Sequence, residues 1–272
     1  MPNHVTNILS IFAEEALHSK ILSEISNFEG SEPMWIDFNK ICPLPQELEG
    51  SCSPPRIVSQ EEYDAQEIRL AKKEYTEEEI KFGVTRGITK TIEQERIQKY
   101  GCADWYVWQT KNWGTKWNAY SQSCSESGEI QFETAWSTPS ELILKLSQKY
   151  PEAVFCVKFA DEDFGHNVGQ YCCQDGEVID SLIPDGGSEL AYQMACEIMN
   201  DWDYITSRLE ELEPQELKAS WAQEFLKIAY RKSLFGDYTS YVWEHLKKLA
   251  LEEENYEMAQ KIKEHLAKEN VD

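Results

Sequence analysis

The sequence predicts an α+β protein in which helices pack on one face of an antiparallel sheet. Three observations predict this class: strand and helix patterns alternate near the N-terminus, hairpin patterns follow in the middle, and the last third is helical. With 272 residues, 41% of them hydrophobic and 12% aromatic, the chain can bury a core in one large domain or in a medium and a small one. This composition argues against global disorder.

The first elements expected are a strand, a helix and a second strand. Residues 5–13 alternate and carry β-branched side chains, which is typical of a strand. Residues 14–28 then place apolar side chains on one helical face. Residues 34–41 ("MWIDFNKI") are predicted as the second strand, ended by the two prolines that follow. We interpret this order as the first half of a split βαβ unit.

An interruption follows this unit. Residues 49–60 are rich in turn formers, and residues 61–99 are charged, weakly apolar and predicted to be helical. We therefore expect residues 49–100 to form a surface insertion in a first domain of residues 1–185. Residues 186–272 are expected to form a helical region that ends in a helical hairpin.

The α+β pattern resumes after the insertion. Residues 117–124 and 129–135 are predicted as a hairpin with "SESG" as its turn. The next helix has Thr138 as its expected N-cap, Pro139 at the first helical position and Glu141 completing a capping box.

The remaining elements are another strand, a second hairpin and a set of helices. Residues 153–159 are predicted as the strand, and the hairpin is expected to turn at Asp175-Gly176. Apolar spacing predicts helices around residues 194–209, 221–228, 241–253 and 256–268.

The net charge is −23, from 49 acidic and 26 basic residues. Because like charges repel, this argues against nucleic-acid backbones and anionic membranes as partners. Between Glu126 and Glu189, thirteen acidic residues face three lysines, a local net charge of −10. Two interpretations stay open: the acids keep the protein soluble, or they imitate the phosphates of DNA.

We expect a cytoplasmic protein without metal or cofactor. No run approaches 18 apolar residues, and the first residues lack a basic region with a cleavage site. The eight cysteines are therefore expected to stay reduced, as buried thiols. A CxxC pair, a P-loop, a GxSxG motif and a dinucleotide-binding fingerprint are all missing from the sequence.

Several phrases together resemble the YubB-type ferredoxin-like domain of plasmid, phage and genomic-island proteins. They are "MPN" followed by Asn7, "FNKICPLPQEL" (38–48), "NWGTKWNAY" (112–120), "FETAWSTPS" (132–140) and "DEDFGHNVGQY" (161–171). The resemblance covers about residues 1–185. The chain departs from it at His4, where the family more often has tryptophan, and in the 161–171 loop. The resemblance implies a ferredoxin-like sheet, not an iron–sulfur protein, and no established activity.

A shorter resemblance lies at the C-terminus. Residues 250–266 ("ALEEENYEMAQKIKEHL") are similar to the helical hairpin of the UVR motif of excision-repair proteins. Because that hairpin serves protein–protein contact, the resemblance implies a partner-binding role for Tyr256, Ile262 and Leu266.

Residues 102–120 hold four of the nine tryptophans and form the main candidate site. Aromatic faces beside an ammonium and a carboxamide suit a planar or phosphorylated, nucleotide-like ligand. The residues expected to bind it are Trp113, Gly114, Lys116, Trp117, Asn118, Tyr120 and Trp136. The alternative is that these tryptophans belong to the core and cover the insertion.

A loop after the 153–159 strand supplies the catalytic candidates. Glu162 and His166 lie close in sequence, and a carboxylate beside an imidazole can do acid–base work, with Lys116 as a third candidate. The alternative is a solvated acidic loop, because spacing alone proves no geometry.

Three classes of function remain. The preferred one is an acidic interaction protein of a mobile element that binds a host protein, with counter-defence and DNA mimicry as forms of it. The second is a binder of a nucleotide-like small molecule. The third is an enzyme acting on that molecule through Lys116, Asn118 and the loop with Glu162 and His166.

Overall fold

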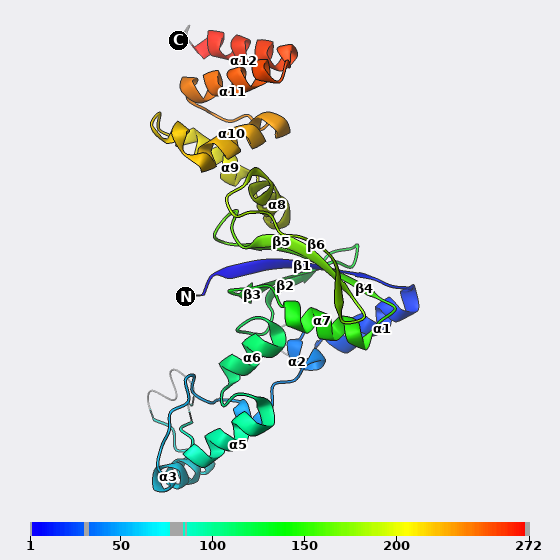
Figure 1. Cartoon of the computed structure of the whole chain (residues 1–272), viewed down its shortest axis with the longest axis vertical. Coiled ribbons are helices and arrows are strands. Elements are labelled where there is room, and N and C mark those ends of the chain that lie inside the picture. Colours follow the sequence, from blue (N-terminus) through cyan, green and yellow to red (C-terminus); the bar gives the residue numbers. More distant parts are fainter. Residues whose placement is uncertain (1, 30–32, 77–83, 85, 270–272) are drawn as a thin grey trace.

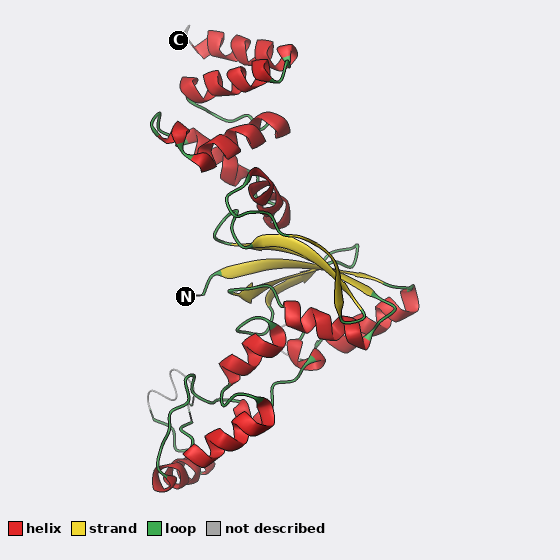
Figure 2. Cartoon of the chain, viewed as in Figure 1, coloured by secondary structure: helices red, strands yellow, loops and turns green. Residues whose placement is uncertain are grey.

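The structure is a computed structural model that describes residues 2–29, 33–76, 84 and 86–269. Six strands form one antiparallel sheet in the order β2-β3-β1-β4-β5-β6 (Figure 2). They are β1 (His4–Phe12), β2 (Tyr120–Cys124), β3 (Ile130–Ala135), β4 (Val154–Asp161), β5 (Val168–Gln174) and β6 (Glu177–Leu182). The first four strands have the βαββαβ order of ferredoxin-like folds, with β5 and β6 added beside β4. The predicted α+β class is confirmed.

One face of the sheet is covered by helices that the sequence predicts. Strand β1 alternates between buried and half-buried residues, because successive side chains point to opposite faces. Its buried Leu9 shares a core with Ile21 of α1 (Glu15–Ile25) and Leu146 of α7 (Ser140–Lys149). The short helix α2 (Phe38–Ile41) adds Phe38 to this core.

The opposite face carries a second core. Helix α8 (Glu189–Met199) packs there, and its Ala195 belongs to the same cluster as Ala160 of β4 and Val168 of β5. Figure 1 shows α8 across the sheet from α1 and α7. Helices therefore lie on both faces, where the sequence predicted one, because α8 turns back over β4 and β5 after β6 ends.

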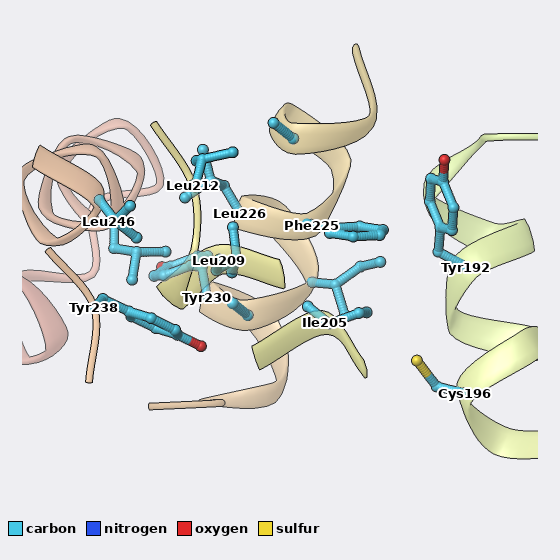
Figure 3. Close-up of a cluster of buried hydrophobic side chains, with 14 of the residues drawn as sticks. Tyr192, Cys196, Ile205, Leu209, Leu212, Phe225, Leu226, Tyr230, Tyr238 and Leu246 are labelled. Atoms are coloured by element: carbon cyan, nitrogen blue, oxygen red, sulfur yellow. The ribbon is translucent and has the colours of Figure 1, made fainter. Parts of the chain in front are cut away.

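The second core continues through the C-terminal helices. These are α9 (Asp203–Glu210), the 3-10 helix η2 (Glu216–Lys218), α10 (Ser220–Lys232), α11 (Ser240–Glu252) and α12 (Tyr256–Glu269). Tyr192 of α8 meets Phe225 of α10 edge to face, with ring centroids 4.7 Å apart. Figure 3 shows how residues of α9 and α10 fill the space between α8 and α11.

The insertion and the C-terminal helices lie at opposite ends of an elongated molecule (Figure 1). The 3-10 helix η1 (Gln46–Leu48) precedes the insertion, which holds α3 (Gln60–Ala71) and α5 (Lys90–Tyr100). Parallel bridges join Ser51 to Arg86 and Ile57 to Ile88. The predicted helical stretch of residues 61–99 is interrupted, because residues 72–76, 84 and 86–89 are not helical, and residues 77–83 and 85 lie outside the described residues.

The prediction of a second strand at residues 34–41 is wrong. Met34 forms only an isolated bridge with Asn27, and Asp37 begins α2 by accepting a hydrogen bond from the Asn39 backbone N–H at 3.0 Å. Aspartate favours such a helix start, so the local cap outweighs the strand pattern. The second strand of the ferredoxin-like order is instead β2, after the insertion.

Two helix predictions also need correction. The predicted helix over residues 194–209 is two helices, because Asn200 adopts the left-handed conformation (φ 53°) and ends α8. Helix α7 forms as predicted, but Thr138 does not cap it. The Thr138 hydroxyl lies 3.2 Å from the Tyr171 hydroxyl, and Pro139 takes the N-cap position.

Both predicted hairpins form, but the first strand begins at Tyr120, so the prediction of a strand from residue 117 is wrong for its first three residues. Strands β2 and β3 pair across a turn at residues 125–129, and β5 and β6 pair across Asp175-Gly176. Both residues of this second turn have positive φ, 50° and 78°, as a two-residue hairpin turn requires. The final helical pair, α11 and α12, also forms as predicted. Among the described residues, no helix has the length and apolar content needed to span a membrane.

Candidate functional site

The tryptophan-rich segment begins as a helix. Helix α6 (Trp105–Trp113) starts at Asp104, whose side chain accepts a hydrogen bond from the Val107 backbone N–H at 3.0 Å, and it ends at Gly114 in the left-handed conformation. Trp113 is only 1% exposed. Its indole N–H donates to the Cys42 carbonyl at 2.8 Å, and its ring packs edge to face on Phe38 at 5.6 Å. Trp113 therefore belongs to the core, and the expectation that it lines a ligand pocket is not met.

The link between α6 and β2 is built from structural contacts. Gly114 has φ 84°, and a Cβ there would lie 3.1 Å from the Ser140 backbone nitrogen. The Asn118 carboxamide accepts from the backbone N–H of Phe38 at 2.9 Å and donates to Asp37 at 2.8 Å. Gly114 and Asn118 were predicted to bind a ligand, but their contacts tie this link to α2 and α7.

The four remaining candidates are partly or fully exposed, and Tyr106, which the sequence did not single out, is exposed near them. We call these five residues the aromatic patch: Tyr106, Lys116, Trp117, Tyr120 and Trp136. The Lys116 ammonium lies 4.7 Å from the Trp117 ring centroid and 5.8 Å from that of Tyr106. The rings of Trp117 and Tyr120 meet edge to face at 6.4 Å. Trp136, which is 49% exposed, follows β3 at the same end of the sheet. Three predicted residues, Lys116, Trp117 and Tyr120, therefore come together with Tyr106, and Trp136 lies at the same end of the sheet.

A titratable cluster borders the aromatic patch. The Tyr120 hydroxyl lies 2.7 Å from His4 Nδ1, and the same nitrogen is 3.9 Å from a Glu133 carboxylate oxygen. Burial, and then the negative charges of Glu133 and Glu162, raise the pKa of Tyr120 to about 12. Tyr120 is therefore a neutral phenol at ordinary pH and can exchange hydrogen bonds with His4 or with a partner.

His4 and Glu133 are functional candidates that the sequence interpretation did not select. The sequence held a pattern that could have selected His4. Burial alternates along β1, so His4, next to the buried Val5, lies on the other face of the sheet. Pairing of β2 with β3 then brings Tyr120 opposite Glu133.

The predicted catalytic residues do not converge. His166 lies 3.8 Å from Asp163, and its ring stands over Gly186. Lys116 is part of the aromatic patch, and Glu162 is exposed on the loop that begins at Asp161. The buried member of this loop is Asp161, which accepts hydrogen bonds from the side chains of Asn3 (2.9 Å) and Asn167 (2.8 Å). The loop is thus held by a structural aspartate, and its exposed Glu162 lies near enough to Tyr120 to raise the pKa of that phenol.

Two cysteines depart from the expectation of reduced thiols. Cys156 and Cys172 stand opposite each other in the β4–β5 pair, with Cα atoms 4.0 Å apart, and form a disulfide. Cys173 points to the other face and is buried, as alternation predicts. Among the described residues, no group of three or more His, Cys, Asp or Glu side chains is arranged to hold a metal ion.

The residues predicted to bind a partner at the C-terminus separate into two environments. Ile262 and Leu266 are 2% and 7% exposed and pack into the second core. Tyr256, at the start of α12, is 67% exposed. Of the three, only Tyr256 has an exposed side chain.

Fold and surface together define a ferredoxin-like α+β protein with an exposed aromatic patch. Residues 112–202 match the family model described as a ferredoxin-like domain in Api92-like protein. A solved structure, the protein api92 from Yersinia pseudotuberculosis, is similar at 11% sequence identity and a TM-score of 0.34, covering 68% of this chain and 99% of that one. The search of curated proteins finds no match. The match to the family model supports the ferredoxin-like assignment, and the YubB-type and UVR-like resemblances stay predictions.

Proposed function

We propose that the chain is an acidic protein-interaction module that contacts its partner through the aromatic patch. The observation that carries this proposal is the exposure of three rings at that surface: Tyr106 (37%), Trp117 (37%) and Trp136 (49%). Tryptophan and tyrosine are enriched among the hot-spot residues of protein interfaces, because each buries a large rigid area on binding. Exposed aromatic groups that gather on one surface mark contact sites.

Charge indicates what the partner looks like. The chain carries −23 overall, and Glu133 and Glu162 lie beside Tyr120 at the border of the aromatic patch. A partner with a basic surface is therefore attracted over a distance, and acidic partners are repelled. Lys116 is held over Trp117 within this acidic border, and it supplies one positive charge for a specific contact.

The test compares a patch variant with a matched control. Trp117→Ala combined with Trp136→Ala removes two exposed rings, whereas Phe12→Ala removes a 60% exposed ring at the far end of β1. The parent protein and the control are expected to capture the same protein from a bacterial lysate, and the patch variant about tenfold less. The captured protein is then purified and titrated by calorimetry. Equal capture by all three proteins, or none above background, ends this proposal.

A nucleotide-like ligand is the second candidate, favoured by the ammonium–indole contact of Lys116 and Trp117. Trp113 and Asn118 no longer support it, because the Trp113 indole N–H donates to Cys42 and the Asn118 amide donates to Asp37. A panel of nucleotides is expected to raise the melting temperature of the parent protein, and Trp117→Ala or Lys116→Ala to abolish the rise. An enzyme of this kind must also consume the nucleotide, which mass spectrometry measures. A panel without any shift removes both forms of this candidate.

A role in a mobile element, with counter-defence by DNA mimicry, stays a prediction. Its support is the acidic segment from Glu126 to Glu189. If the captured partner binds DNA, the parent protein is expected to compete with DNA for it, and neutralising acids of this segment is expected to weaken the competition. A partner that binds DNA and this chain at the same time contradicts mimicry.

A further inference from the structure

The two edges of the sheet are treated differently. Strand β2 forms one edge, and its Gln122 side chain accepts from the backbone N–H of Ile36 at 2.9 Å and donates to the Ile36 carbonyl at 3.0 Å. The chain around Ile36 is thereby fastened along β2. The exposed side chains of β2 are also polar, Ser121 and Ser123. Covering an edge and making it polar are the usual protections against unwanted strand pairing.

Strand β6, at the other edge, is not covered, and only part of it is polar. All six of its residues are exposed, and within the described chain it pairs with β5 on one side and with no strand on the other. Apolar side chains make up much of this edge: Val178 (52% exposed), Ile179 (53%), Leu182 (41%) and, just after the strand, Ile183 (61%). A free edge with exposed β-branched and aliphatic residues is a surface on which another strand can pair.

The register of β6 limits where pairing can occur. The β5–β6 pairing shifts between Val178 and Asp180, so Ile179 is the extra residue of a bulge. The ladder is regular from Asp180 to Leu182, and Pro184 follows without a backbone N–H. A paired strand therefore meets a short edge centred on residues 180–183.

Charge selects the occupant. Acidic residues are interspersed with the apolar ones along this edge: Glu177, Asp180 and, just after it, Asp185. A second copy of this chain would bring the same acids and a net charge of −23 to the contact. A strand with basic side chains meets opposite charges instead, and cross-strand pairs of opposite charge stabilise pairing.

We propose that the free edge of β6 is a docking site for an extended segment of a partner protein in which apolar and basic residues alternate. The segment adds a strand to the sheet. Its main chain supplies hydrogen bonds to β6. Its apolar side chains lie on the face that carries Val178 and Ile183, and its basic side chains lie on the face that carries Glu177 and Asp180. This surface lies at the opposite edge from the aromatic patch and does not depend on the role of that patch.

The test uses the full chain and a labelled, end-blocked seven-residue peptide of alternating lysine and valine. Fluorescence anisotropy measures its binding. Two further peptides carry N-methyl groups on alternate residues. In one peptide the methyl groups are on the odd-numbered residues, and in the other they are on the even-numbered residues. Because only one set of N–H groups faces β6 in a paired strand, one methylated peptide is expected to bind about tenfold more weakly and the other to bind as the parent peptide does.

Protein variants locate the site. Asp180→Asn with Glu177→Gln, and separately Leu182→Lys, are expected to weaken binding about tenfold, whereas the matched β2 variant Ser121→Lys with Ser123→Lys weakens it less than twofold. Three results overturn the proposal: no binding, equal binding of both methylated peptides, or a larger effect of the β2 variant. A dimer in sedimentation equilibrium that Leu182→Lys dissociates assigns the edge to a second copy and also overturns it.

Discussion

Trp113 and Trp117 lie four residues apart and take opposite roles. The first is buried with its N–H bonded to Cys42, and the second is 37% exposed beside Lys116. The difference arises because α6 ends at Gly114, so Trp113 is on the inner face of a helix and Trp117 is on the loop that leaves it. Proximity in sequence therefore does not give the two indoles one function.

These environments predict unequal costs of substitution. Trp113→Ala is expected to lower the free energy of unfolding by about 3–5 kcal/mol, because it opens a cavity next to Phe38 and leaves a buried carbonyl without its donor. Trp117→Ala is expected to change it by less than about 1 kcal/mol, since its ring already meets water. Urea titration followed by circular dichroism measures both values. Equal losses for the two variants contradict this assignment.

The sequence predicted part of the site, and its misses have a common cause. Residue types and spacing sufficed to select Lys116, Trp117 and Tyr120, which do gather at the surface. The partners of Trp113 and Asn118, at Cys42 and Phe38, come from the segment around α2, which was predicted as a strand. Because the helix α2 was not predicted, no pattern in residues 102–120 could show that the polar groups of Trp113 and Asn118 are hydrogen-bonded within the fold.

At the scale of the element, predictions succeeded where short-range chemistry decides the structure. The turn at Asp175-Gly176 needs two residues with positive φ, and aspartate followed by glycine supplies them. The predicted helix over residues 194–209 failed because apolar spacing continues through Asn200, whose left-handed conformation ends α8. Apolar periodicity indicates which residues are buried. It does not reveal where one helix ends and the next begins when both helices bury the same face.

The C-terminal hairpin gives a prediction about element packing. Ile262→Ala in α12 is expected to cost about 2–4 kcal/mol, because Ile262 is 2% exposed and packs into the second core. Tyr256→Ala is the matched control in the same helix, and at 67% exposure it is expected to change stability by less than about 0.5 kcal/mol. Thermal unfolding gives both values, and hydrogen exchange of α12 amides is expected to speed up only for Ile262→Ala. Unchanged exchange in that variant would show that α12 does not depend on this core.

The β4–β5 pair gives a prediction about cysteine chemistry. Because Cys156 and Cys172 are bonded, the unfolded, unreduced protein is expected to take up six alkyl groups from iodoacetamide, one for each of Cys42, Cys52, Cys102, Cys124, Cys173 and Cys196. Prior reduction is expected to raise the number to eight, the total in the sequence. Intact-mass spectrometry counts the groups. Eight alkyl groups without prior reduction would show that Cys156 and Cys172 are two thiols and not a disulfide, as the sequence predicted.

At the scale of the whole molecule, the sheet separates two cores. One lies between the sheet and α1, α2 and α7, and the other extends from α8 to α12. Titratable groups are buried in both: Cys173 in the first, and Cys196 and Tyr238 in the second. Burial disfavours the charged forms of thiols and phenols, so it raises the pKa of Cys173 to about 11 and those of Cys196 and Tyr238 to about 12.

These shifts predict that the folded state loses stability in alkaline solution. Ordinary thiols and phenols have pKa values of 9.0 and 10.0, so the unfolded chain releases these protons as the pH rises above about 9, while the folded chain keeps them until about pH 11–12. In that interval the folded state binds more protons, so the free energy of unfolding decreases with pH, and below it these groups contribute no pH dependence. Tyr120, whose pKa is also raised to about 12, acts in the same direction. Urea unfolding at about pH 8 and about pH 10.5 measures the loss, and Cys196→Ala is expected to reduce the difference between the two pH values, since it removes one of the titrating groups. Equal free energies of unfolding at both pH values would show that these side chains have the same pKa values in the folded state as in the unfolded chain.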